Sequence, residues 1–291
     1  MNLYHYTDLN AVHSILDTNI IRMTDIRFLN DKTEYLQGLQ ILEEASHEIF
    51  PQDPMYDPEF LNVLEGWLEK AFKELFEYES ASEVFYVTSF SRSSDILSQW
   101  RSYGMFAIEF DEVKLAERVS NFILERINST NRSVNMEFIE CHYVSDVPNA
   151  IEEASELICS KVITTMDAWW QKGAPLEKNL HLYTDLKEII SMLATTFKHS
   201  SFSEEQEVRL VVSNEITSEK INFRTKNNIL VPFYELDVTK EVISGVIIGP
   251  VENQKITEHS LDLYNLHRAA KLGGERYRLT IETSDIPYRM L

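Results

Sequence analysis

Residues 83–91 read Glu-Val-Phe-Tyr-Val-Thr-Ser-Phe-Ser, and this run of β-branched and aromatic residues predicts the central strand of a sheet. Further strand-like runs lie at 3–7, 106–110 and 208–212. Apolar residues at helical spacing lie between the strands, as in 59–79. Because the strands are scattered among helices instead of alternating with them strictly, the sequence predicts an α+β fold with a split, mixed β-sheet core.

The 291 residues suffice for one large domain or for a domain with a helical insertion. The spacing of apolar residues predicts long helices from Asn149 to Trp170 and from Asp185 to Phe197. We therefore expect a single α+β domain over residues 1–291, with the helical segments 32–79 and 149–197 as insertions.

The composition argues against several classes of protein. Lys and Arg number 27 against 47 Asp and Glu, and the resulting net charge of −20 repels nucleic-acid backbones at long range. No apolar run approaches the roughly 18 residues of a membrane span, and no signal peptide is visible, so we expect a cytoplasmic protein with no membrane partner. Cys141 and Cys159 lack metal-type spacing and are expected to be buried free thiols.

His5 lies at the centre of the run Leu3 to Thr7 and is the first polar residue that interrupts the apolar pattern. By strand alternation it faces away from its neighbours Tyr4 and Tyr6. A buried imidazole needs a hydrogen-bond partner for each nitrogen. Two interpretations stay open: a structural histidine with both nitrogens bonded, or a residue that binds a substrate.

A second polar cluster lies at a predicted strand-to-helix junction and contains Arg27, Asn30, Asp31 and Glu34. Asn30 or Asp31 at this position would cap the helix by accepting hydrogen bonds from free backbone amides. Capping does not account for Arg27, which is expected to pair with Asp31 or Glu34.

A third cluster follows the central strand. Its hydroxyl groups could orient a ribose or an amide, and its aromatic rings could stack on a flat ring. A serine-rich turn beside a packed tryptophan would explain the same residues equally well. The cluster comprises Thr88, Ser89, Ser91, Gln99, Trp100, Arg101 and Tyr103.

The fourth cluster is Glu205-Gln206-Glu207-Val208-Arg209, which leads into an apolar strand. In a strand, Glu205 and Glu207 project from the same face. Two adjacent carboxylates in a water-poor cleft raise the pKa of one of them, which suits acid–base or cation-stabilising chemistry. A solvated loop is the alternative, although Arg209 offers the carboxylates a partner inside the fold.

In these four clusters the chain is similar to an uncharacterised bacterial family. The shared segments are Leu3 to Thr7, Arg27 to Glu34, Leu97 to Gly104 and Phe202 to Arg209. The resemblance extends from residue 3 to about residue 250.

More distantly, the order of His5, the strand Tyr86 to Ser91 and the Glu205/Glu207 pair resembles the ADP-ribosyltransferase fold, including its RNA 2′-phosphotransferase and DNA-modifying toxin branches. The resemblance implies an enzyme that cleaves NAD and transfers ADP-ribose to a macromolecular acceptor, a protein or a nucleic acid. It also implies a role as a bacterial toxin or phage-defence effector, with an antitoxin as a further partner. NAD is the expected co-substrate, and no metal is expected.

The resemblance further implies a role for each site residue. Glu207 would stabilise the oxocarbenium-like cation as nicotinamide leaves, and Glu205 would orient or deprotonate the acceptor. His5 would bind a ribose, Tyr86 or Tyr103 would stack on nicotinamide, Ser89 or Ser91 would position the ring, and Arg27 or Arg101 would neutralise the pyrophosphate. The NAD-binding residues implied in this way are His5, Tyr6, Thr7, Arg27, Tyr86, Ser89, Ser91, Arg101 and Tyr103.

Two other hypotheses compete with the transferase. One is a non-catalytic module that binds a ligand or a partner and uses its polar clusters as caps and salt bridges. The other is a metal-dependent hydrolase or nuclease that uses Asp31, Glu34, Glu205 and Glu207. A cleft shared by His5 and Glu207 would favour the transferase, whereas a position on opposite sides of the sheet would count strongly against it.

Overall fold

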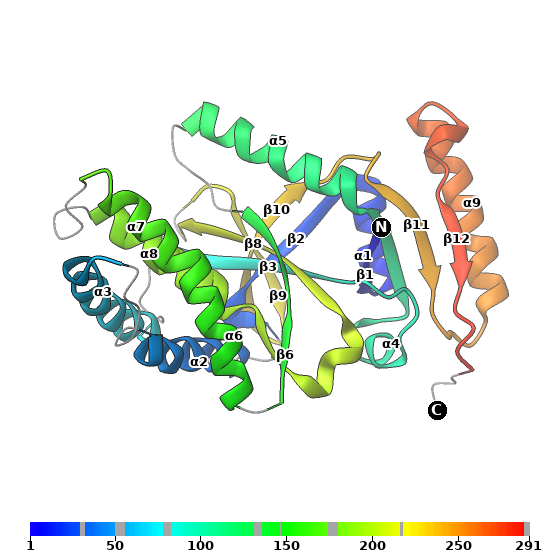
Figure 1. Cartoon of the computed structure of the whole chain (residues 1–291). Coiled ribbons are helices and arrows are strands. Elements are labelled where there is room, and N and C mark those ends of the chain that lie inside the picture. Colours follow the sequence, from blue (N-terminus) through cyan, green and yellow to red (C-terminus); the bar gives the residue numbers. More distant parts are fainter. Residues whose placement is uncertain are drawn as a thin grey trace.

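The computed structural model of the chain describes residues 1–29, 33–49, 56–77, 83–130, 136–145, 147–173, 180–215 and 218–287. Within these residues the fold is α+β, as predicted, with a mixed, mostly antiparallel sheet at its centre (Figure 1). The strands of this sheet are β1 (Asn2–Thr7), β2 (Ile20–Asp25), β3 (Glu83–Ser91), β4 (Phe106–Asp111), β5 (Met136–Glu140), β8 (Glu207–Glu215), β9 (Ile221–Lys226), β10 (Ile229–Asp237), β11 (Ile243–Ile248) and β12 (Thr280–Thr283).

The sheet divides at β3. One edge of β3 pairs along its whole length with β8, and β8 in turn pairs with β5. The other edge is shared: β1 pairs with it at Ser91, and β2 pairs with it at Val87 and Tyr86. From there β1 continues into β4, β11 and β12, whereas β2 continues into β10 and β9. Between the two contacts, Thr88 to Phe90 have no register partner in β1 or β2.

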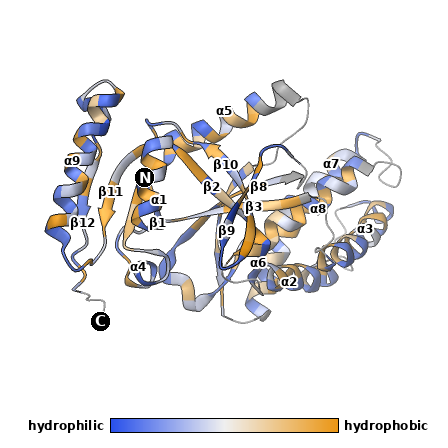
Figure 2. Cartoon of the chain, turned by 180° about the vertical axis from the view of Figure 1, so that it is seen from behind, coloured by the Kyte–Doolittle hydropathy of each residue, from blue (hydrophilic) through white to orange (hydrophobic). Residues whose placement is uncertain are grey.

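Both faces of β3 are buried, which explains its continuous apolar sequence. Val84, Tyr86 and Phe90 belong to one hydrophobic core, and Phe85 and Val87 belong to another on the opposite face. The first core is covered by α1 (Leu9–Thr18), α5 (Glu112–Thr130) and α9 (Gln254–Leu272). In Figure 2, α9 lies beside β11 and β12, α1 lies near β1, and α5 runs above β2 and β10.

The second core is formed with a layer of helices at the other end of the molecule (Figure 1). Helix α2 contacts α3, α6 and α8, so the two segments expected as insertions meet in one layer. The predicted helix from Asn149 to Trp170 is interrupted by a π-helical turn at Ile158–Ile163. The layer comprises α2 (Thr33–Ile49), α3 (Pro58–Phe76), α6 (Val147–Leu157), α7 (Thr164–Trp170) and α8 (Leu180–Ala194).

Shorter elements connect these layers. A two-stranded parallel sheet of β6 (His142–Val144) and β7 (Phe197–His199) leads into a 3-10 turn, η5 (Ser200–Glu205), directly before β8. Helix α4 (Leu97–Tyr103) follows β3.

Among the described residues, no helix combines the length and the apolar character needed to cross a membrane. Both cysteines are free thiols, as expected, but they are partly exposed rather than buried.

Two helical glycines provide a matched test of how closely the helices pack. A Cβ atom at Gly38 in α2 would lie 2.0 Å from the carbonyl oxygen of Ala194 at the end of α8, whereas a Cβ atom at Gly66 in α3 would meet nothing within 4 Å. We expect Gly38→Ala to lower the free energy of unfolding by about 1–3 kcal/mol through overpacking. Gly66→Ala should raise it by up to about 1 kcal/mol through helix propensity. Urea titrations measure both values, and shifts of the same sign would contradict the close packing of α2 on α8.

Candidate functional site

Three segments far apart in the sequence meet at one end of β3. Tyr4 in β1 pairs with Ser91, and Ser91 pairs with Glu207 at the start of β8. The Ser91 hydroxyl also donates a 2.7 Å hydrogen bond to the backbone oxygen of Glu205. The first strand of the chain, the end of β3 and the start of β8 therefore lie next to one another in the sheet.

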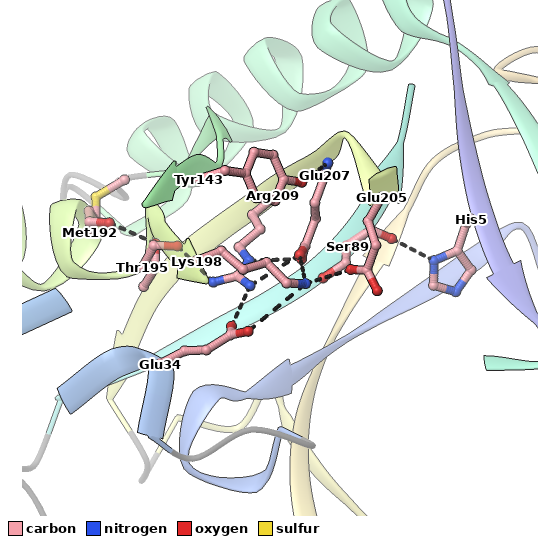
Figure 3. Close-up of polar contacts among 10 residues, drawn as sticks. All are labelled: His5, Glu34, Ser89, Tyr143, Met192, Thr195, Lys198, Glu205, Glu207 and Arg209. Carbon is pink, nitrogen blue, oxygen red and sulfur yellow. Dashed lines mark hydrogen bonds and ion pairs between the residues drawn. The ribbon is translucent and has the colours of Figure 1, made fainter. Parts of the chain in front are cut away.

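Glu205 and Glu207 do not alternate along one strand, as the sequence predicted, because Glu205 ends the η5 turn and Glu207 begins β8. Gln206 adopts a left-handed conformation with φ of 44°, which ends η5 and starts β8. Both carboxylates consequently point toward Lys198 of β7, as Figure 3 shows. The Glu207 backbone amide donates a 2.7 Å hydrogen bond to the Tyr143 hydroxyl, which fixes the first residue of β8.

A buried group of charges surrounds Glu207, and we call it the ion cluster. Lys198 Nζ lies 2.6 Å from Glu205 Oε2 and also binds Glu207 Oε2. Arg209 Nε lies 2.8 Å from Glu207 Oε1, and Arg209 Nη2 lies 2.7 Å from Glu34 Oε2 in the first turn of α2. The cluster consists of Glu34, Lys198, Glu205, Glu207 and Arg209.

Burial makes the ion cluster an interdependent unit. Glu205 is 4% exposed and Glu207 is 6% exposed, so neither carboxylate can be stabilised by bulk water. Arg209 Nη1 also donates a 2.7 Å hydrogen bond to the Thr195 carbonyl, so each of the three guanidinium nitrogens has a hydrogen-bond acceptor. Removing one member of such a buried group leaves an uncompensated charge, which is strongly destabilising.

The two glutamates of the cluster differ electrostatically. Burial tends to raise the pKa of Glu207, but the adjacent Arg209 and Lys198 outweigh this effect and hold its pKa well below the usual range. Burial also raises the pKa of Glu205, and there Lys198 compensates only in part, so the pKa stays above its ordinary value. Both oxygens of Glu207 bind cations, whereas among the described residues Lys198 is the partner of the Glu205 carboxylate. Glu205 is therefore the better proton acceptor.

Two exposed aromatic rings lie beside this part of the cluster. Phe202 is 41% exposed and its ring centroid lies 5.1 Å from Lys198 Nζ. Tyr103, at the end of α4, is 40% exposed; burial of its hydroxyl and the nearby Glu205 carboxylate raise its pKa to about 12. The arrangement offers flat apolar surfaces next to a carboxylate.

His5 lies on the other side of β3 and has a defined tautomer. Its Nδ1 lies 2.9 Å from the carbonyl oxygen of Ser89 (Figure 3), where the edge of β3 that faces β1 and β2 has no strand partner. Burial lowers the pKa of the imidazole, and because a carbonyl can only accept, the neutral ring donates through Nδ1. Nε2 is then a hydrogen-bond acceptor.

The register separates His5 from Glu207. Tyr4 shares the face of Ser91 and Glu207, so His5 projects from the opposite face, where its ring centroid lies 6.0 Å from that of Phe90. The expectation that His5 and Glu207 face one cleft is therefore not met, because strand alternation turns neighbouring side chains apart.

Other predicted site residues have structural partners. Arg27 pairs with the buried carboxylate of Asp25, with Nη2 2.7 Å from Oδ2. Tyr86 is fully buried in the core, so its ring has no face open to a nicotinamide. Asn30 and Asp31 lie outside the described residues.

The residues around α4 also contribute to packing. The Tyr6 hydroxyl donates to the Ser93 carbonyl at 3.0 Å, and its ring packs on buried Trp100. The backbone of Thr7 lies against Gly104, where a Cβ atom would come 2.4 Å from the Thr7 oxygen and φ is +133°. This contact explains why a glycine follows Tyr103. Arg101 is exposed on α4.

Lys198 and Phe202 are the residues that sequence reasoning missed. Lys198 falls in a three-residue strand directly after α8, where the sequence predicts the end of a helix. A lysine seven residues before Glu205 carries no recognisable motif, and only the meeting of β7 with η5 reveals its role.

Comparisons with known proteins give one match. A family model described as "Protein of unknown function (DUF2971)" matches residues 99–210, less than half of the chain. The matched segment includes Lys198, Glu205, Glu207 and Arg209, but not His5 or Glu34. No curated protein and no solved structure matches the chain.

The depressed pKa of Glu207 predicts how stability depends on pH. The unfolded-state pKa of a glutamate is about 4.3. Since the folded-state pKa is lower, ionised Glu207 contributes stability that is fully present above the unfolded value and lost as the pH falls toward the folded one. Urea unfolding between pH 7 and pH 3 should therefore show a shallower acid loss in Glu207→Gln than in wild type. Glu117→Gln, an exposed site on α5, is the control and should follow wild type.

Proposed function

We propose that this protein cleaves the bond between nicotinamide and ribose in NAD and transfers ADP-ribose to a macromolecular acceptor, a protein or a nucleic acid. The observation that carries the proposal is the Glu205 carboxylate, which is buried, has a raised pKa and lies beside two exposed aromatic rings. The role as a cytoplasmic toxin or phage-defence effector, with an antitoxin partner, rests on the sequence resemblance alone.

The chemistry assigns Glu205 the central role. As the C1′–N bond breaks, nicotinamide leaves with the bonding electron pair, and an oxocarbenium-like cation develops on the ribose. A carboxylate fixed in a water-poor site stabilises that cation. The acceptor then bonds to C1′ and gives its proton to Glu205. Because Lys198 also binds Glu207, the lysine can stay with Glu207 while Glu205 interacts with the substrate.

The surrounding residues take binding roles in this proposal. Phe202 and Tyr103 would stack on the nicotinamide ring. His5 takes no part in this proposal, because it projects from the opposite face of the sheet, beside Phe90. Arg101 would bind the pyrophosphate.

The proposed roles differ from those that the sequence resemblance implied. Glu205 instead of Glu207 stabilises the cation, because both oxygens of Glu207 already bind Arg209 and Lys198. Its part is to hold the two cations in place, so that Glu205 keeps one carboxylate oxygen for the reaction.

The adjacent glutamates allow a matched test. Glu204 is exposed, whereas Glu205 and Glu207 are buried. We expect Glu205→Gln to lower nicotinamide release from NAD by at least roughly 100-fold with an unchanged circular dichroism spectrum, because the cation loses its carboxylate. Glu204→Gln should retain wild-type turnover. Chromatography of the products measures the release, and equal turnover in both variants would refute the role of Glu205.

The wild-type protein supplies a separate test of the substrate. We expect NAD to raise the melting temperature, since a ligand that binds only the folded state stabilises it. NAD that stays intact after incubation with protein, RNA and DNA acceptors, together with an unchanged melting temperature, would rule out the proposal.

A second candidate function is a non-catalytic binding module. The observation that favours it is the connection of α2 to β8 through Glu34 and Arg209, by which the ion cluster fastens the helical layer to the sheet. In that case Arg209→Met would cost about 3–5 kcal/mol of stability, and NAD would produce no thermal shift.

The metal-dependent hydrolase gains no comparable support. Lys198 Nζ already lies between the carboxylates of Glu205 and Glu207, where a divalent cation would otherwise bind. Asp31, which this hypothesis also uses, lies outside the described residues, and no metal-binding group of three His, Cys, Asp or Glu side chains occurs within them.

A further inference from the structure

A second site candidate lies at the opposite end of the sheet from the helical layer, by β11 and β12 (Figure 1). It is a hollow of about 400 Å³, which we call the basic hollow. One carboxylate, that of Glu241, faces four cationic side chains there. The cations come from the first turn of α5, the loop before β11 and the η6 turn (Glu275–Tyr277) with the residue after it: Lys114, Lys240, Arg276 and Arg278.

This concentration of positive charge is notable because the chain carries a net charge of −20. Two of the cations have acidic partners near the surface: Lys114 pairs with part-exposed Asp111 at 3.2 Å, and Arg278 pairs with exposed Glu275 at 3.7 Å. Exposed pairs of this kind contribute little and yield readily to a better anion. The hollow therefore offers cations that a ligand can bind.

Lys240 and Arg276 are held in place by an aromatic ring instead of a carboxylate. Lys240 Nζ lies 4.2 Å and Arg276 Cζ 4.8 Å from the centroid of the Tyr277 ring. Among the described residues neither cation has a carboxylate within 4.0 Å, and cation–π contact leaves their N–H groups open to an acceptor. Tyr277 thus orders two charged side chains before any ligand arrives.

We infer that the basic hollow binds a small ligand that carries two or more phosphate groups. Lysine and arginine are the side chains that bind phosphate oxygens most strongly, and Arg does so through two parallel hydrogen bonds. The volume falls in the usual range of small-molecule sites. The overall negative charge repels a long polyanion such as a nucleic acid, whereas it acts only weakly on a compact ligand seated among four cations.

The inference is independent of the proposed NAD chemistry. The basic hollow is lined by α5, β11 and the residues before β12, whereas the ion cluster belongs to α2, β7, η5 and β8. Loss of NAD cleavage would leave the phosphate site untouched, and loss of phosphate binding would leave NAD cleavage untouched.

Calorimetric titration of the full chain with tripolyphosphate tests the inference. We expect binding in the micromolar range, and at least roughly tenfold weaker binding in the double variant Lys240→Gln with Arg276→Gln, which removes two charge-assisted contacts. The double variant Lys220→Gln with Lys255→Gln removes the same charge at exposed positions outside the hollow and should bind like wild type. No binding, or an equal loss in both double variants, would overturn the inference.

A variant that should bind tripolyphosphate more tightly provides a test that misfolding cannot imitate, because a misfolded protein would lose affinity. Glu241→Gln removes the carboxylate of the hollow and should strengthen tripolyphosphate binding several-fold; unchanged affinity would contradict the placement of the ligand. A thymidine oligonucleotide is the competing probe. If it binds at the same residues more tightly than tripolyphosphate, the ligand is a nucleic acid and the proposed small ligand is wrong.

Discussion

The buried pairing of Glu207 with Arg209 and Lys198 is the interaction on which the candidate site depends. It lets a strand that is otherwise apolar begin with a charged residue inside the protein. Buried ions are tolerated only when their partners have good geometry and their remaining hydrogen bonds are made. Here the partners come from β7, β8 and α2, so the position of each of these elements is tied to the others.

The division of the sheet at β3 determines the surroundings of His5. If one strand covered the whole free edge of β3, the Ser89 carbonyl would bind a backbone amide and His5 would have no role there. Because β1 and β2 each pair with only part of the edge, a side chain has to satisfy that carbonyl, and His5 does so. The same bond fixes the imidazole tautomer, so the sheet topology sets the protonation of His5.

Several features could be predicted from the sequence because they are local. The apolar run at 83–91 identified the central strand, and the scatter of strands among helices identified the α+β class. The partner of Glu207 could be predicted because Arg209 follows two residues later in the same strand, whereas the expected place of Glu205 in that strand was wrong. In contrast, the partners of these residues depend on distant parts of the chain. Lys198 and Glu34 meet the acidic pair only through tertiary contacts, and the opposite facing of His5 and Glu207 depends on the register of three strands.

The span of the contact between Glu34 and Arg209 also has a consequence for how the protein is made. These residues are 175 positions apart, so the ion cluster cannot close until most of the chain has left the ribosome. A nascent or truncated chain that stops before β8 holds neither Glu207 nor Arg209, and its Glu34 stays hydrated. An enzyme built on this cluster would be inert during translation until Arg209 has left the ribosome.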